Sequence, residues 1–245
     1  SAALLEALIP PSNAAILFSA LTNVPVSQTF AAGIVPGIIL LVLMIILVLI
    51  KCRNIKSNVP ATGSEKFMAF VKAIPALITP IIILGGIYAG LLTPSESAAV
   101  AGVWAIMMGF LIYRELTLSL LLKCLKETAT ITAVIFSIIA MATFLSVVLT
   151  YTQVPQKIIT HFTDLGGGVW FFWLALALIC LTLGTFIEIV PVFYLTVPIF
   201  AALALSLKID ILHLYVVFVA FAGIGMITPP VCVGIYTSAS VIQEN

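Results

Sequence analysis

Long apolar segments separated by short polar stretches make up most of this chain. A helix needs about 20 apolar residues to cross the hydrocarbon core of a bilayer. The segment 31–50 reaches that length without a charged residue. Further apolar segments follow at 73–92, 98–113, 129–150, 169–205 and 212–242. The pattern predicts an all-α protein that crosses a membrane several times.

The last two apolar segments are too long for one straight span each. The segment 169–205 contains Glu188 between Gly184 and Pro191, and the segment 212–242 contains the pair Pro229-Pro230. Proline has no amide donor and clashes with the preceding turn of a helix. We therefore expect both segments to be interrupted inside the membrane.

The polar stretches predict how the chain is threaded. The stretch 51–72 carries five Lys or Arg and the stretch 114–126 carries three, so the positive-inside rule places both in the cytoplasm. The residues between them must then enter the membrane and return, as two spans or a re-entrant hairpin, with a turn at 92–95. Thr93 and Glu96 have the spacing of a capping box, with Pro94 at the first helical position. This motif favours a structural role for Glu96 over a binding role.

Composition excludes several classes of protein. Hydrophobic residues make up 63% of the chain and charged residues 8%, whereas soluble domains carry about 25% charged residues. A lipid bilayer is the expected partner, and no basic stripe suits nucleic acid. No GxGD, HExxH or GxSxG motif occurs on a plausible elbow, so no enzyme is expected. His161 and His213 are expected in polar connections, and the cysteines are expected to be small core residues.

Two proline pairs lie in similar surroundings. The string ALIPPSNAAILFSA from Ala7 overlays MITPPVCVGIYTSA from Met226, which places Pro10-Pro11 on Pro229-Pro230. Unpaired backbone groups at membrane depth are tolerated only where they line protein or a watered cavity. Two such breaks in corresponding places indicate a transporter built from repeats, with its binding site between them. The alternative is that both pairs only kink helices for packing.

Glu188 is a candidate functional residue because a charged side chain at the centre of a membrane helix costs about 2.5 to 3.5 kcal/mol. A structural alternative is that it is protonated or pairs with an absent subunit. A channel would favour continuous pore-lining helices or carbonyl filters over paired breaks. A purely structural partner subunit would have no use for this carboxyl group.

Four strings of the chain resemble one transporter family, in the order in which that family has them. They are ILGGIYAGLLTPSESAAVAGVWAIMMGFLIYRELTL from Ile83, YTQVPQKI from Tyr151, LGTFIEIVPVFYLTVPIF from Leu183 and GIGMITPPVCVG from Gly223. They are similar to the large membrane subunit, of the DctM type, of TRAP transporters. The resemblance covers nearly the whole chain and corresponds to the second half of such a subunit plus the end of the first half.

The resemblance implies a polytopic helical bundle with inverted repeats, discontinuous helices and re-entrant hairpins, working as an elevator. It assigns residues 1–30 to the end of the first-repeat transport core, with a broken helix. Residues 31–128 would form scaffold helices, a cytoplasmic loop and a connecting arm. Residues 129–245 would form the second-repeat transport core, with a hairpin and a broken helix.

The resemblance also implies a sodium-coupled secondary transporter in the bacterial inner membrane, with Na⁺ as coupling ion and no organic cofactor. It would import a small organic anion, of the C4-dicarboxylate or sialic-acid type, delivered by a periplasmic binding protein. A small four-helix membrane subunit would accompany it. The alternative is another membrane anion carrier or a channel subunit that needs no binding protein.

Site residues are implied by the resemblance as well. One sodium site would be formed, largely by main-chain carbonyls, at Gly184, Gly225, Thr228 and Val231. The other would use the stretch 6–12, with Glu6 and Ile9 among its residues. The substrate would lie at the start of the half-helix after the first proline pair and near the intramembrane acid, at Ser12, Asn13, Ala14 and Glu188.

Overall fold

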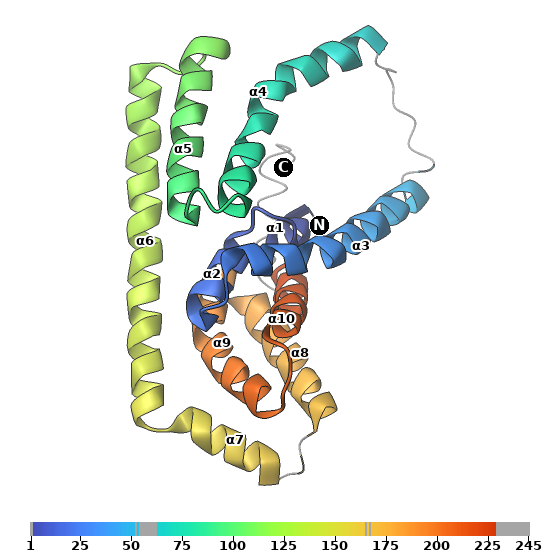
Figure 1. Cartoon of the computed structure of the whole chain (residues 1–245), viewed down its shortest axis with the longest axis vertical. Coiled ribbons are helices and arrows are strands. Elements are labelled where there is room, and N and C mark those ends of the chain that lie inside the picture. The colour runs from blue at the N-terminus through green and yellow to red at the C-terminus, as the bar shows by residue number, and fades with distance from the viewer. Residues whose placement is uncertain (1, 52, 54–62, 165, 167, 229–245) are drawn as a thin grey trace. The chain divides into compact units, whose positions relative to one another are not determined.

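The computed structural model describes residues 2–51, 53, 63–164, 166 and 168–228, and within these ranges it contains helices and no strand (Figure 1). The helices in chain order are α1 Ala2–Leu8, α2 Asn13–Thr22, α3 Val26–Lys51, α4 Gly63–Tyr88, α5 Pro94–Met107, the π-helical turn η1 Met108–Ile112, α6 Leu118–Tyr151, α7 Val154–Asp164, α8 Val169–Phe186, α9 Ile189–Ser206 and α10 Ile211–Met226.

Six of the described helical segments are long and apolar enough to cross a membrane. They are Val26–Lys51, Lys66–Tyr88, Pro94–Ile112, Leu118–Tyr151, Val169–Phe186 and Ile189–Ser206. The prediction of an all-α polytopic membrane protein is therefore confirmed.

The chain divides into two compact units, which are described separately. The first unit comprises Ser1–Leu41 and Ala133–Asn245, and the second comprises Val42–Thr132. The helices α3 and α6 each contribute residues to both units.

Aromatic side chains form the core of the first unit. The ring of Phe18 in α2 lies 5.2 Å from Tyr215 in α10 and 6.5 Å from Phe193 in α9, centroid to centroid. The Phe193 ring in turn lies 4.7 Å from the Phe218 ring. All four side chains are fully buried. Because aromatic pairs contribute packing energy beyond their buried area, this cluster holds α2, α9 and α10 together.

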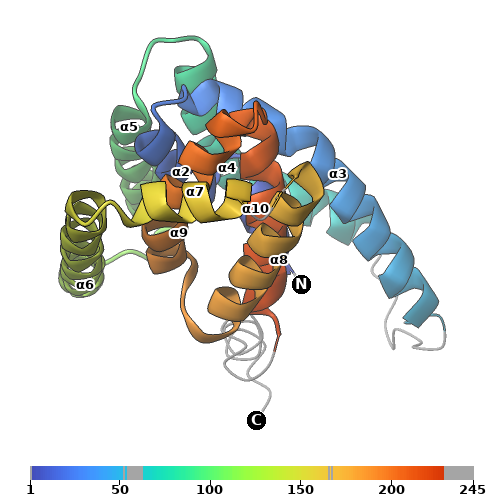
Figure 2. The ribbon, with the colours of Figure 1, turned by 90° about the horizontal axis from the view of Figure 1, so that it is seen from below.

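The segment 169–205 is interrupted, as predicted. α8 ends at Phe186 and α9 begins at Ile189, and the residues between them, Ile187 and Glu188, have extended backbone conformations. α9 turns back along α8, and α10 then runs beside both (Figures 1 and 2). Trp173 lies 4.8 Å from His213 near the starts of α8 and α10, centroid to centroid, and Gly184 contacts Gly225 near their ends, so these two helices run parallel.

A hairpin of α4 and α5 forms much of the second unit. The Trp104 indole donates to the Pro75 carbonyl at 3.1 Å, and the Tyr113 hydroxyl donates to the Lys72 carbonyl at 2.9 Å. These bonds join the middle of α4 to the end of α5 and to the residue that follows η1. The described residues between the two basic stretches therefore form a helical hairpin, and the side of the membrane on which its ends lie stays a prediction.

The turn between α4 and α5 carries the predicted capping box. The Thr93 amide donates to a Glu96 carboxylate oxygen at 2.7 Å, and the Glu96 amide donates to the Thr93 hydroxyl at 3.3 Å. Each side chain therefore satisfies a backbone donor at the start of α5. This geometry accounts for Glu96 as a structural residue.

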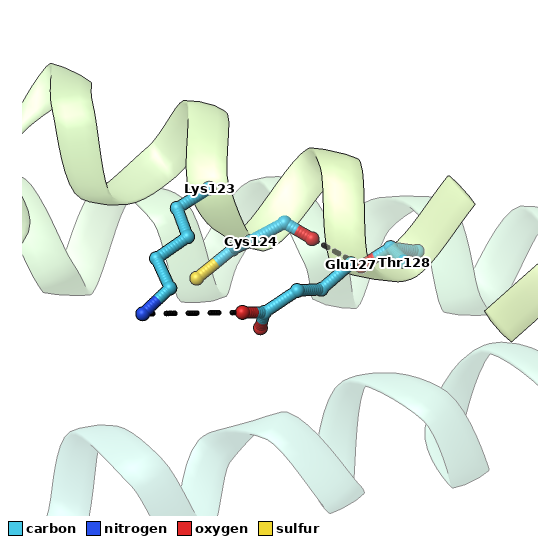
Figure 3. Close-up of polar contacts among 4 residues, drawn as sticks. All are labelled: Lys123, Cys124, Glu127 and Thr128. Atoms are coloured by element: carbon cyan, nitrogen blue, oxygen red, sulfur yellow. Dashed lines mark hydrogen bonds and ion pairs between the residues drawn. The ribbon is translucent and has the colours of Figure 1, made fainter. Parts of the chain in front are cut away.

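Two helices begin earlier than hydrophobicity alone predicts, since α4 starts at Gly63 and α6 at Leu118. At α6 the Thr117 hydroxyl accepts the Leu120 amide at 3.2 Å. Lys123 and Glu127 form an ion pair one turn apart at 4.0 Å (Figure 3). The capping hydrogen bond and the exposed ion pair stabilise the turns of α6 that precede its apolar segment.

Two expectations about individual residues are wrong. His161 lies in α7 and His213 in the first turn of α10, where its amide donates to the Asp210 carboxylate at 2.9 Å. Cys180 is buried as expected, but Cys124 is exposed on α6. The reason is that the helices continue through these polar stretches, whereas amino-acid composition alone predicts connecting loops there. Cys52 and Cys232 lie outside the described residues.

Candidate substrate and cation site

The first proline pair interrupts a helix in the first unit. α1 ends at Leu8 and α2 begins at Asn13, with the cis-linked pair Pro10-Pro11 between them. The residues that follow Glu6 and Ala7 by four positions are these two prolines, which have no N–H. The carbonyls of Glu6 and Ala7 therefore lose their helical hydrogen bonds.

The two carbonyls are treated differently by the surrounding protein. The Ala7 carbonyl accepts the Ser12 hydroxyl at 2.6 Å and the Tyr215 hydroxyl at 3.4 Å. Among the described residues, none donates to the Glu6 carbonyl. Of these two oxygens, the Glu6 carbonyl is the better candidate for a cation, because no described residue donates to it, whereas the Ala7 carbonyl accepts two hydroxyls. The Glu6 side chain is exposed, and the half-buried Ile9 donates its amide to the Leu5 carbonyl at 2.8 Å.

The predicted substrate residues lie at the start of α2. Ser12 is its N-cap, with a hydroxyl that accepts the Ala15 amide at 3.4 Å, and it is buried. Ala14 is buried as well, whereas Asn13 is exposed. A ligand at this end of α2 therefore meets the Asn13 side chain, while the Ser12 hydroxyl is already engaged in the fold.

Gly184 and Gly225 bring the ends of α8 and α10 together. A Cβ built on Gly184 would lie 2.9 Å from the Ala222 carbonyl oxygen and 3.2 Å from the Gly225 Cα. The last carbonyls of a helix lack partners within the helix, and its C-terminal end carries a partial negative charge. Where two parallel helices end side by side, their free carbonyl oxygens and partial negative charges therefore favour the binding of a cation.

Thr228 lies just beyond the end of α10. Its hydroxyl donates to the Ile224 carbonyl at 2.7 Å, and its amide donates to the Gly225 carbonyl at 2.9 Å. Because the hydroxyl proton points back to the helix, the oxygen lone pairs remain available to a cation. Val231 lies outside the described residues.

The two proline pairs have the same effect on the backbone. Pro229 and Pro230 follow Gly225 and Met226 by four positions, as Pro10 and Pro11 follow Glu6 and Ala7. Since proline has no N–H, each pair removes two helical hydrogen-bond donors. α10 ends at Met226, but Pro229, Pro230 and the rest of the segment to residue 242 lie outside the described residues, so the interruption stays a prediction.

Glu188 occupies the link between α8 and α9. It is the N-cap residue of α9, its side chain makes no capping hydrogen bond, and it is exposed. It lies four residues after Gly184, at the same end of α8 as the glycine contact. The carboxylate therefore lies at a helix interruption and does not cap α9.

The structure adds three residues to the site that were not predicted. Gly33 of α3 faces the Leu8 carbonyl so closely that a Cβ there would collide with it, and a Cβ on Gly37 would lie 2.7 Å from Ile9 Cγ1. The GxxxG spacing of these glycines is a known signal for close helix contacts in membranes. Tyr215 has no such local signal.

Comparison with known proteins assigns the family. The model of the DctM component of tripartite ATP-independent periplasmic transporters matches residues 1–245. The C4-dicarboxylate TRAP transporter large permease protein DctM of Pseudomonas aeruginosa is 36% identical over 243 residues, or 98% of this chain and 57% of that protein. The sialic acid TRAP transporter large permease protein SiaM of Vibrio cholerae is 31% identical over 236 residues, or 96% of this chain and 55% of that protein.

A third relative is the isethionate TRAP transporter permease protein DctMQ of Oleidesulfovibrio alaskensis. It is 30% identical over 241 residues, or 97% of this chain and 38% of that protein. The chain thus spans between 38% and 57% of the length of these relatives. Because the family model matches the chain from end to end, the chain belongs to the DctM family of tripartite ATP-independent periplasmic transporters, a family of transporter permeases and not of enzymes.

Proposed function

We propose that this chain forms part of the large permease of a sodium-coupled transporter in the bacterial inner membrane, which imports a small organic anion. The observation that carries the proposal is the contact of Gly184 with Gly225, which joins two helix ends beside Glu188 and Thr228. Such ends offer carbonyl oxygens and a partial negative charge, the surroundings that a hard cation prefers.

Sodium would bind at both interruptions. At the second, the ligands would be main-chain carbonyls of Gly184, Gly225 and Val231, together with the Thr228 hydroxyl. At the first, the stretch 6–12 would contribute, with the Glu6 carbonyl as the strongest candidate and Ile9 as part of the same turn. The loss of amide donors at both proline pairs supports this assignment.

The organic anion would bind at the start of α2, where helix N-termini favour negative charge. Asn13 would reach it with its side chain, and Ser12 and Ala14 would line the same turn. Glu188 cannot attract an anion itself, so it would hold a cation, accept a sugar hydroxyl or carry a proton. The C4-dicarboxylate, sialic acid and isethionate in the relatives' names support an organic anion as the substrate, without selecting one acid group.

Transport would proceed by an elevator movement, in which a core built from the broken helices moves against a scaffold. The chain divides between residues 41 and 42 and again between residues 132 and 133. The moving core would consist of the residues before the first division together with those after the second. Partners would be a small four-helix membrane subunit and a periplasmic binding protein that delivers the anion.

Uptake by the full-length transporter in proteoliposomes tests the proposal. Radiolabelled C4-dicarboxylates and sialic acid would be offered with the cognate binding protein under an inward sodium gradient. We expect uptake of a carboxylate that stops when potassium replaces sodium. Uptake at full rate in potassium would refute sodium coupling, and uptake without the binding protein would favour an independent carrier.

A further inference from the structure

The Tyr215 hydroxyl is the buried polar group that joins the second half of the first unit to the first proline pair. Tyr215 is fully buried in α10, and its hydroxyl donates to the Ala7 carbonyl, 208 residues earlier in the chain. A buried hydroxyl without a partner is costly, so this bond has a structural reason to persist. The Ala7 carbonyl needs a donor because Pro11 cannot supply one.

The turn after α1 is held on other sides as well. The Ser12 hydroxyl donates to the same Ala7 carbonyl at 2.6 Å. The backbone of α3 approaches the neighbouring Leu8 carbonyl at Gly33, and the Gly33 Cβ position would lie 3.7 Å from the Tyr215 hydroxyl. α2, α3 and α10 therefore converge on the turn that carries the Glu6 carbonyl.

The same helix α10 ends at the other candidate cation site. Tyr215 precedes Gly225 by ten residues, which is about 15 Å along an α-helix. A continuous helix transmits a displacement of one end to the other, since its hydrogen bonds resist bending. The hydroxyl of Tyr215 therefore connects the turn at 6–12 to the helix end at Gly225 and Thr228.

We propose that Tyr215 is a positioning residue that couples the two interrupted helices, so that sodium binding at one end of α10 favours sodium binding at the turn after α1. The proposal rests on the sodium sites of the proposed function. Tyr215 is not assigned as a ligand, because its side chain is fully buried and its ring packs against Phe18. It acts by holding that carbonyl and thereby fixing the orientation of the preceding Glu6 peptide.

The test is a sodium titration of the purified full-length transporter, with choline as the balancing cation and thermal stabilisation as the readout. Tyr215→Phe keeps the buried ring and removes only the hydroxyl. We expect the half-saturating sodium concentration to rise roughly fivefold and the Hill coefficient to fall towards 1, because one neutral hydrogen bond is lost. Tyr194→Phe, a half-buried position on α9, is the matched control and should leave both values unchanged.

Gly33→Ala provides a second variant, because its Cβ would displace the same turn from the side of α3. It should weaken the sodium response in the same direction. A normal sodium response of the wild type with identical titrations for Tyr215→Phe or Gly33→Ala would overturn the coupling and leave the proposed function standing. A wild type without any sodium response would overturn the proposed function, and the coupling with it.

Discussion

Gly184 and Gly225 lie in direct backbone contact, and a Cβ on Gly225 would stand 2.9 Å from the Gly184 Cα. It would also stand 3.1 Å from the Cys180 carbonyl oxygen. These neighbours are backbone atoms, so they cannot move aside as a flexible side chain does. The parallel ends of α8 and α10 can meet this closely only because both positions lack a side chain.

Gly225→Ala should therefore separate the two helix ends. We expect a destabilisation of about 1 to 3 kcal/mol from overpacking, together with a loss of sodium-dependent stabilisation. Thermal melting in detergent with and without sodium measures both effects. Gly102→Ala is the control, because a Cβ there meets no heavy atom within 4 Å among the described residues. If the Gly225 variant melted like the wild type, the contact of α8 with α10 would be wrong.

Substitutions of Thr228 should distinguish the effect of its hydroxyl group on sodium binding from the effect of its side-chain size. Thr228→Val removes the hydroxyl that donates to the Ile224 carbonyl and keeps the shape of the side chain. We expect the half-saturating sodium concentration for uptake to rise about tenfold. This corresponds to a loss of roughly 1.4 kcal/mol of sodium-binding free energy when one oxygen ligand is removed. Thr228→Ala should weaken sodium dependence as well. Thr228→Ser retains the hydroxyl and should stay near the wild type, and equal losses for Val and Ser would point to packing instead.

Glu188→Gln should affect transport more than stability. The side chain is exposed and makes no capping hydrogen bond, so the melting temperature without sodium should stay close to that of the wild type. If Glu188 holds a cation or carries a proton, initial uptake should fall about tenfold or more, because an amide supplies neither the negative charge nor the proton-binding site. Uptake at the wild-type rate would assign Glu188 to a structural role or to an unused surface.

The elements found by sequence reasoning are those with a local chemical cause. The break at Glu188, the turn at Pro10-Pro11 and the capping box of Thr93 each depend on residues within a few positions of one another. Proline and a capping carboxylate change hydrogen bonding in their own turn, so their effect is visible without the fold.

The contacts that were missed depend on residues far apart in the chain. Tyr215 reaches the Ala7 carbonyl across 208 positions, and nothing near Tyr215 in the sequence indicates that partner. The early start of α6 was missed because apolar length was taken as the limit of the helix. The polar residues Thr117 and Lys123 extend it through capping and an ion pair, which hydropathy does not measure.

The capping box at α5 offers a test of the structural role of Glu96. Thr93→Ala removes the hydroxyl that accepts the Glu96 amide, which should destabilise the protein by about 1 kcal/mol. The apparent melting temperature should fall by about 2 °C, with the sodium dependence of uptake unchanged. Ser95→Ala, at an exposed position of the same helix, is the control. A changed sodium dependence in Thr93→Ala would instead place this turn in the binding site.

The charges of α6 predict on which sides of the membrane its two ends lie. The uncharged part, 128–151, is about 36 Å long as a helix, enough to cross a hydrocarbon core of about 30 Å. Lys123, with 72% of its side chain exposed, should then lie in the cytoplasm, and Gln156 in α7 on the periplasmic side. In a cysteine-free background, we expect an impermeant maleimide to label Gln156→Cys in intact cells and Lys123→Cys only after permeabilisation. Labelling of both in intact cells would show that α6 does not span the membrane, since its ends would then share one side.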